Sequence, residues 1–171
     1  PLDGALLRSG ARVGDEVYVS GTLGDAAAGL AFLSDSELCS PTPDHAEFLV
    51  ERFNRPRAQL ELGRTLLRRA SAAIDISDGL LADAGHIAAA SGVKLVIDPE
   101  QLPLSAALAA SASPEQARLW ALTGGDDYEL CFTLPAGESA PPGCTPIGQA
   151  EQGEGVDCGM ALDIPPGYQH F

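Results

Sequence analysis

The sequence is poor in basic residues. Ten Lys and Arg stand against 24 Asp and Glu, which gives a formal net charge of −14 at pH 7. Because nucleic-acid backbones are bound by fields of Lys and Arg, this balance argues against a nucleic-acid partner. A phosphorylated ligand would need metal ions or another chain to offset the repulsion. Six of the basic residues gather in one helical region, which favours a solvated helix face over a phosphate-binding patch. These are Arg52, Arg55, Arg57, Arg64, Arg68 and Arg69.

Long apolar runs are absent as well, because Asp, Gly and Ser interrupt the Ala-rich stretches. No run approaches the roughly 20 residues that a membrane-spanning helix needs, so no membrane partner is expected. The start of the chain lacks the basic and then apolar pattern of a signal peptide. It also lacks an initiating Met, which suggests a processed or truncated product. The length of 171 residues, without a long repeat or low-complexity linker, predicts a single domain over 1–171.

Cysteine is sparse and scattered. The four cysteines form no Cys-x-x-Cys pair and no short Cys/His cluster, so zinc and iron–sulfur sites are not expected. The three histidines are equally scattered and are interpreted as surface or capping residues. The sequence does not exclude disulfides. In a chain without an export signal we expect reduced thiols and a cytoplasmic location.

The run 72–83 carries the clearest chemical signal. Apolar and β-prone residues lead into Asp75, Ser77 and Asp78, then Gly79 and a run of Leu and Ala, a pattern that indicates strand, polar turn and helix. Residues alternate faces along a strand, so Asp75 and Ser77 should point the same way while the isoleucines beside them pack on the other face. Two carboxylates and a helix N-terminus suit Mg²⁺ with phosphate oxygens, because Mg²⁺ takes one or two carboxylates and leaves its other positions to water and phosphate.

A plainer interpretation stays open at this point. Asp, Ser and Gly are also turn and N-cap residues, so Ser77 or Asp78 could simply cap the helix that follows. A second strand, glycine turn and helix occurs at 16–33, without the Lys and the spacing of a P-loop. There Asp25 either caps the helix or faces a nucleotide at a shared sheet edge.

Periodicity and turn residues predict the remaining elements. Asp44 is expected to cap a helix that runs to about Phe53. Further helices are expected at 57–70, as a short Ala-rich helix after 103, and from Pro114 to Thr123. Strands are expected at 93–97, within 124–133, at 145–147 and at 160–163, with loops at 135–143 and 149–155. Trp120 and Cys131 are interpreted as packing residues. Glu129 alternates with buried strand residues and is expected on the solvent face.

Five motifs in order resemble the thiamine-monophosphate kinase family, in particular its C-terminal domain. They are Arg8-Ser9-Gly10-Ala11 through Gly14-Asp15, Ser20-Gly21-Thr22-Leu23-Gly24-Asp25, Ile74-Asp75-Ile76-Ser77-Asp78-Gly79-Leu80, Gly124-Gly125-Asp126-Asp127-Tyr128-Glu129-Leu130 and Gly167-Tyr168-Gln169-His170-Phe171. The superfamily includes aminoimidazole ribonucleotide synthetase and selenophosphate synthetase. The resemblance implies an α/β fold of the α+β type, a mixed β-sheet flanked by helices, and an N-terminal ATP-binding domain that this chain does not contain.

The resemblance also implies an activity, the ATP- and Mg²⁺-dependent phosphorylation of thiamine monophosphate to thiamine diphosphate by direct in-line transfer in a full-length homodimer. It assigns roles to six residues, which are the metal ligands Asp75 and Asp78, the ATP contacts Arg8 and Ser77, and the substrate contacts Asp126 and Tyr168. No residue is required as a covalent nucleophile. The isolated domain would hold only part of the site and is expected to have little turnover.

One position departs from the family pattern. The family usually has Glu where this chain has Asp126, so the carboxylate is retained but its reach falls by about 1.5 Å, roughly one C–C bond. The contact with substrate could then be bridged by water. Two rival functions remain, a different enzyme of the superfamily that acts on an aminoimidazole precursor or on selenide, and a non-catalytic acidic binding module. In the module, Asp75, Asp78 and Asp126 would be surface caps.

Overall fold

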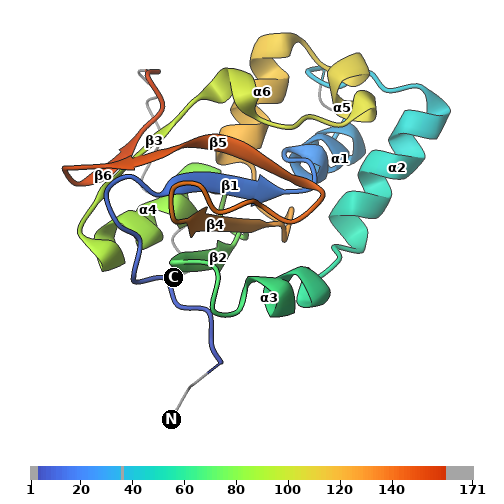
Figure 1. Ribbon diagram of the computed structural model, residues 1–171. Coiled ribbons are helices and arrows are strands. Elements are labelled where there is room, and N and C mark those ends of the chain that lie inside the picture. Colours follow the sequence, from blue (N-terminus) through green and yellow to red (C-terminus); the bar gives the residue numbers. More distant parts are fainter. Residues whose placement is uncertain (1–3, 36, 161–171) are drawn as a thin grey trace, which may run out of the picture.

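The computed structural model describes residues 4–35 and 37–160. These residues form one mixed six-stranded sheet with helices around it (Figure 1). The strands are β1 (Glu16–Ser20), β2 (Ala72–Asp75), β3 (Lys94–Ile97), β4 (Leu130–Leu134), β5 (Cys144–Glu151) and β6 (Gly155–Asp157). The helices are α1 (Asp25–Leu33), α2 (Pro43–Asn54), α3 (Leu60–Leu66), α4 (Leu80–Ser91), α5 (Ala106–Ser111) and α6 (Pro114–Thr123), with a 3₁₀ turn η1 at Pro99–Gln101.

The strand order is β2-β4-β1-β5-β3-β6. Every neighbouring pair is antiparallel except β3 and β6, which run parallel, so the sheet is mixed as the family resemblance implied. Strand residues alternate between two apolar clusters. Val17 and Val19 of β1 belong to the cluster that α4 covers, whereas Tyr18 stacks on Phe132 of β4 on the opposite face, with ring centroids 5.6 Å apart.

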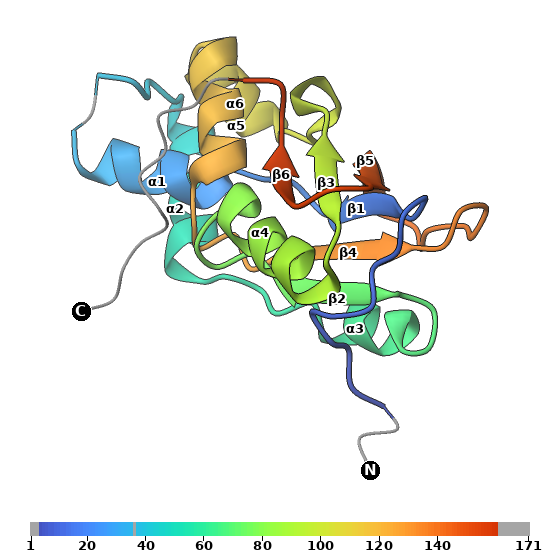
Figure 2. The same ribbon diagram turned by 90° about the vertical axis from the view of Figure 1, so that its left-hand side faces the viewer.

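The helices divide into two groups. Helix α4 lies across one face of the sheet, and α3 lies below β2 (Figure 2). The helices α1, α2, α5 and α6 pack together at one end of the sheet around a third apolar cluster that includes Leu49 and Leu108. Gly29 permits the close approach of α1 to α2, because a Cβ there would lie 2.3 Å from the carbonyl oxygen of Leu49. Among the described residues no helix is long and apolar enough to cross a membrane.

Three element predictions were wrong. The helix expected at 57–70 is confined to Leu60–Leu66, because the chain turns at Arg68, whose φ is 66°. The expected loop at 149–155 is largely strand, since β5 continues to Glu151 and pairs with β3. Helix α2 begins at Pro43, and Thr42 rather than Asp44 is its N-cap. Of the strand expected at 160–163, Met160 lies outside any strand and the other residues fall outside the described part of the chain.

Candidate functional site

The segment after β2 adopts the predicted strand, turn and helix. Asp75 is exposed at the end of β2, while Ile74 and Ile76 are buried, as the alternation predicted. Ser77 and Asp78 are half-buried in the turn. The N-cap of α4 is Gly79, with φ 109° and ψ 148°, and neither neighbour caps the helix through its side chain. The capping interpretation of Ser77 and Asp78 is therefore wrong.

The turn is held instead by Asp83, in the first turn of α4. This side chain is only 2% exposed, and its Oδ2 accepts hydrogen bonds of 2.9 Å from the backbone N–H groups of Ser77 and of Asp78. Burial raises the pKa of Asp83, and the charge of Asp78 acts in the same direction, whereas the two N–H groups act against it. Asp83 is not among the residues predicted for the site, although an acid inside an otherwise apolar helix turn is a visible signal in the sequence.

The loop 124–130 lies directly against this turn. The N–H of Asp126 donates to the carbonyl of Ser77 over 3.0 Å, and the N–H of Tyr128 donates to the carbonyl of Ile76 over 2.9 Å. Gly125 permits the contact, because a Cβ there would lie 2.4 Å from the Ser77 oxygen. Asp126 is exposed, with φ 65° in the left-handed region. The structure thus brings the predicted substrate acid beside the predicted ATP and metal segment.

Arg8 lies elsewhere on the sheet edge. Its neighbour Leu7 accepts a hydrogen bond from the N–H of Ala73 in β2, and its own carbonyl accepts one from the hydroxyl of Ser91 at the end of α4. Asp78 precedes the other end of this helix of 12 residues, which is about 18 Å long at 1.5 Å per residue. The role of Arg8 stays a prediction. Tyr168 lies outside the described residues.

A pocket of about 300 Å³ opens beside the loop 124–130. Its walls come from α1, from the end of α2, from α6 and from the loop, and they are apolar except at Asp126. The lining residues are Ala26, Ala27, Leu30, Ala31, Phe53, Trp120, Gly124, Gly125 and Asp126. An apolar pocket with two aromatic side chains and a single carboxylate suits a flat organic ring that carries positive charge.

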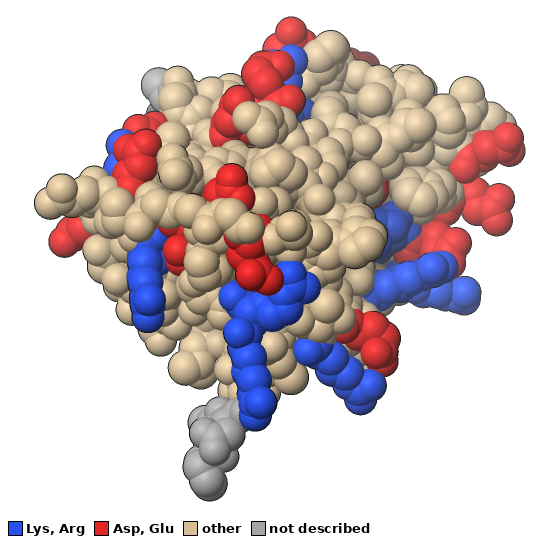
Figure 3. Space-filling model, viewed as in Figure 1, with Lys and Arg blue, Asp and Glu red and all other residues tan. Residues whose placement is uncertain are grey.

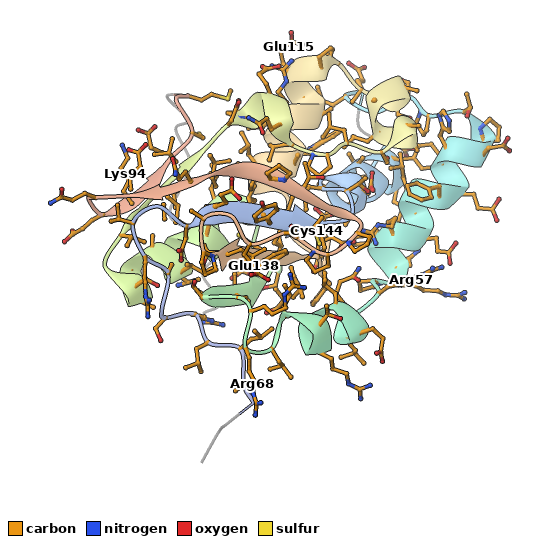
Figure 4. All side chains as sticks on the ribbon, in the orientation of Figure 1. Arg57, Arg68, Lys94, Glu115, Glu138 and Cys144 are labelled. Atoms are coloured by element: carbon orange, nitrogen blue, oxygen red, sulfur yellow. The ribbon has the colours of Figure 1, made fainter. Side chains whose placement is uncertain are left out.

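The arginine-rich region is only partly a solvated face. On the face seen in Figure 3, Lys and Arg side chains project below the sheet and around the end of α2, and Arg57 points away from the protein in Figure 4. The side chain of Arg57 is 80% exposed, but that of Arg52 is only 15% exposed. Arg52 pairs with Glu129 over 3.1 Å and lies 3.7 Å from Asp25. The prediction of a solvated face is therefore wrong for Arg52.

Two acids of this region also differ in their surroundings from the prediction. Glu129 is 3% exposed and accepts a short hydrogen bond from the hydroxyl of Ser20, so the solvent-face prediction is wrong. Asp25 is fully buried, its Oδ atoms accept hydrogen bonds from Thr22 and Ser105, and it does not cap α1. The N-cap of α1 is Gly24. Trp120 and Cys131 pack in apolar clusters, as predicted.

The donors for a metal ion are few. Among residues 4–35 and 37–160 no group of three or more His, Cys, Asp or Glu side chains could hold one. Asp75 and Asp78 nevertheless fit Mg²⁺ as carboxylate donors, because this ion is usually bound by one or two carboxylates plus phosphates and water. Asp75 is exposed and Asp78 is half-buried, and both flank the turn that Asp83 fixes.

Comparison with known proteins supports the same family. The sequence matches the family "AIR synthase related protein, C-terminal domain" over residues 12–156. It is 50% identical over 135 residues to thiamine-monophosphate kinase of Escherichia coli K12, which covers 79% of this chain and 41% of that protein. The chain thus spans less than half the length of this curated relative.

Two solved structures resemble the chain closely. Thiamine-monophosphate kinase from Stenotrophomonas maltophilia K279a has a TM-score of 0.84 at 42% identity, over 91% of this chain and 53% of the other. AaThiL complexed with AMPPCP and TMP also has a TM-score of 0.84, at 43% identity, over 97% of this chain and 54% of the other. These matches confirm the fold and the resemblance. The chain belongs to the AIR synthase related protein, C-terminal domain family.

Proposed function

We propose that this chain is the C-terminal domain of a thiamine-monophosphate kinase, which uses ATP and Mg²⁺ to convert thiamine monophosphate into thiamine diphosphate. One observation carries the proposal. The apolar pocket with Asp126 at its wall is joined by backbone hydrogen bonds to the turn that carries Ser77 and Asp78. A site for an acceptor ring therefore lies beside a site suited to phosphates. A relative of 43% identity, AaThiL, has been solved with AMPPCP and TMP.

The pocket suits thiamine by size and charge. Phe53 and Trp120 supply aromatic surface for flat rings, and the Asp126 carboxylate can attract the positive thiazolium or accept a hydrogen bond from the aminopyrimidine. The N–H of Asp126 donates to the carbonyl of Ser77, so this lining residue is bound directly to the turn. The shorter reach of Asp relative to Glu leaves space for a bridging water at this contact. In the proposal Tyr168 covers the bound ring.

Phosphoryl transfer requires alignment and charge stabilisation rather than covalent chemistry by the protein. In the proposal Asp75 and Asp78 hold Mg²⁺, which when bound neutralises charge on the phosphate oxygens. Ser77 and Arg8 contact ATP, and the N-terminal end of α4 favours negative charge near Gly79. Asp83 keeps the turn in one conformation by binding its two N–H groups. A phosphate oxygen of the substrate attacks the γ-phosphorus of ATP in line, the bond from this phosphorus to the β,γ-bridging oxygen breaks, and ADP leaves with the electron pair. No residue of the chain becomes phosphorylated.

The remaining parts of the proposal concern the whole protein. The described chain contributes one half of the site, and an N-terminal domain supplies further ATP and metal contacts and the interface of a homodimer. The coverage of 41% to 54% of the relatives supports a partner domain of similar size. All four cysteines are free thiols, which agrees with the proposed cytoplasmic location.

The test is an assay of the full-length enzyme with ATP, Mg²⁺ and thiamine monophosphate, with thiamine diphosphate measured by chromatography. Asp75→Ala and Asp78→Ala should each lower kcat/KM by about 100-fold or more, the range seen when one charge-stabilising group is removed. Asp44→Ala is the matched control, because Asp44 is exposed on α2. Folding is checked by circular dichroism.

The outcomes separate the rivals. Unchanged activity of both site variants would favour the acidic binding module. No thiamine diphosphate, together with turnover of an aminoimidazole precursor or of selenide in a substrate panel, would favour another enzyme of the superfamily.

A further inference from the structure

A buried charged cluster lies beneath the proposed pocket and has no part in the proposed chemistry. It contains three carboxylates and one guanidinium. Asp25, Asp127 and Glu129 are 0%, 1% and 3% exposed, and the Arg52 side chain is 15% exposed. Buried charges are costly unless they are paired, so this cluster needs a structural or functional reason.

Arg52 is the centre of the cluster. Its Nη2 lies 3.1 Å from Oε1 of Glu129, 3.4 Å from the carbonyl oxygen of Thr22 and 3.5 Å from the carbonyl oxygen of Asp127. Its Nε lies 3.7 Å from Oδ2 of Asp25 and is buried without a hydrogen bond. One side chain of α2 therefore joins the β1–α1 turn to the loop 124–130.

A second carboxylate completes this connection. Asp127 accepts hydrogen bonds from the N–H groups of Gly24 and Ala26, over 2.6 Å and 3.2 Å, at the start of α1. Glu129 is packed against Gly21, where a Cβ would lie 2.4 Å from its Oε1. The end of β1, the start of α1 and the loop thus meet in one hydrogen-bonded unit.

Three of the four members of the cluster lie next in sequence to a residue that lines the pocket. Asp25 precedes Ala26, and Arg52 precedes Phe53. Asp127 follows Asp126. Any movement of the cluster must therefore move three walls that come from three separate parts of the chain.

We propose that Arg52 is a positioning residue, which fixes the spacing of the pocket walls so that they accept the flat ring of the substrate. This inference rests on the proposed function for the identity of that ring. Arginine is required because its planar guanidinium reaches several acceptors at fixed angles, whereas lysine is a single point charge. Arg52 itself does not touch the substrate.

The first experiment measures steady-state kinetics in the full-length enzyme. Arg52→Gln and Arg52→Lys should raise KM for thiamine monophosphate by about tenfold or more, and should change kcat and KM for ATP by less than about threefold. Arg57→Gln, which alters an exposed arginine just beyond α2, should leave all three constants unchanged. An unchanged KM for thiamine monophosphate in both Arg52 variants, or an equal change in all three constants, would overturn the proposal.

A misfolded Arg52→Gln variant does not end the test. Its carboxylates would lack their cation, so the double variant Arg52→Gln/Glu129→Gln removes one of them and restores a better charge balance. The double variant should fold, as judged by circular dichroism, and should show the same selective rise in KM. A wild-type KM in the folded double variant also contradicts the role of Arg52.

The second experiment needs no substrate. Trp120 lines the pocket and is the single tryptophan of this chain, so acrylamide quenching of its fluorescence reports access to the pocket. In the full-length protein, with any tryptophan outside this chain replaced by Phe, Arg52→Gln should raise the quenching constant by about twofold through loosened packing. An unchanged constant would overturn the proposal even if the kinase assignment holds. A wild-type protein without kinase activity would reject the proposed function but not the spacing role.

Discussion

The two strand–turn–helix units of this chain have the same local pattern but opposite surroundings. In both, a strand leads through a polar turn to a glycine N-cap, and a buried aspartate accepts two backbone N–H groups of the turn or the first helical residues. In the β2–α4 unit this aspartate is Asp83, which lies five and six residues from its donors. In the β1–α1 unit it is Asp127, which is 101 and 103 residues away from Ala26 and Gly24.

The difference shows how one pattern serves two purposes. Because Asp83 satisfies the β2–α4 turn from within its own helix, Asp75 stays exposed and Asp78 half-buried, where they can meet a ligand. The β1–α1 turn is covered by the loop 124–130 and by Arg52, so Asp25 is fully enclosed. In the proposed function, the β2–α4 unit presents the site for metal and ATP, and the β1–α1 unit holds together the pocket beside it.

The largest expected effect concerns the two glycine N-caps. A Cβ at Gly79 would lie 2.6 Å from the carbonyl oxygen of Thr123, in a backbone conformation (φ 109°, ψ 148°) that is almost restricted to glycine. Gly79→Ala should therefore reduce the free energy of unfolding by about 4 kcal/mol, from strain and overpacking together. Gly24→Ala, at φ 83°, should cost about 3 kcal/mol.

The matched control is Gly85→Ala in the middle of α4, where an added Cβ meets open space. It should stabilise the protein by up to about 1 kcal/mol, because alanine is the better helix former. Chemical denaturation measures all three variants. If Gly79→Ala reduces the free energy of unfolding by less than Gly24→Ala does, the greater strain assigned to the β2–α4 turn is contradicted.

The next prediction compares the two buried aspartates, Asp83 with donors close in sequence and Asp127 with donors far away in sequence. Asp83→Ala and Asp127→Ala each leave two backbone N–H groups without an acceptor, so each should reduce the free energy of unfolding by about 3 kcal/mol. Hydrogen exchange should differ between them. Asp83→Ala should increase exchange only around 76–83, whereas Asp127→Ala should increase it both at the start of α1 and in the loop 124–130.

Asp44→Ala, at an exposed acid of α2, serves as the control for both substitutions. Increased exchange confined to the loop in Asp127→Ala would show that the loop does not support α1.

The last prediction is a pH dependence that belongs to the β1–α1 unit. Burial raises the pKa of Asp127 from 3.8 to about 7, with the charge of Asp25 adding to this and the N–H groups of Gly24 and Ala26 and the charge of Arg52 opposing it. The folded state therefore holds a proton that the unfolded state releases. The stabilisation that this proton gives the folded state is complete below pH 3.8 and is lost as pH rises through about 7.

The measurement is the free energy of unfolding between pH 4 and pH 8 for wild type and Asp127→Asn. In the wild type the free energy of unfolding should decrease as pH rises, by at most about 1.4 kcal/mol per pH unit for one proton. Asp127→Asn should lack this decrease. Asp44→Asn should keep the wild-type profile. Parallel profiles for wild type and Asp127→Asn would show that Asp127 does not titrate in this range.

Local signals in the sequence predicted most of the elements. Alternating Val17, Tyr18 and Val19 do form a strand, and Ser113 does cap α6 by accepting a hydrogen bond from the N–H of Gln116. Gly92 ends α4 in the left-handed conformation. These features depend on interactions between residues a few positions apart, which a single stretch of sequence contains in full.

The failures occurred where a distant partner decided the outcome. Gln149 and Glu151 are polar and only Ala150 lies between them, which is too short a pattern to indicate a strand. Yet Gln149 pairs with both β1 and β3, and Ala150 and Glu151 pair with β3. Glu129 and Arg52 have side chains that usually face water. Here Glu129 is buried and Arg52 is largely enclosed, because each compensates the charge of the other. Their separation of 77 residues left no trace in the local pattern.

The sequence by itself determined the chain's family, the strand and helix of the β2–α4 unit, and the identity of the acids in its turn. Only the tertiary structure decided that the loop 124–130 lies against this turn, that an apolar pocket opens beside it, and that Arg52 is enclosed beneath that pocket. The physical reason is that backbone conformation and capping are set by neighbouring residues, whereas the burial of a charge depends on the partners that folding brings to it.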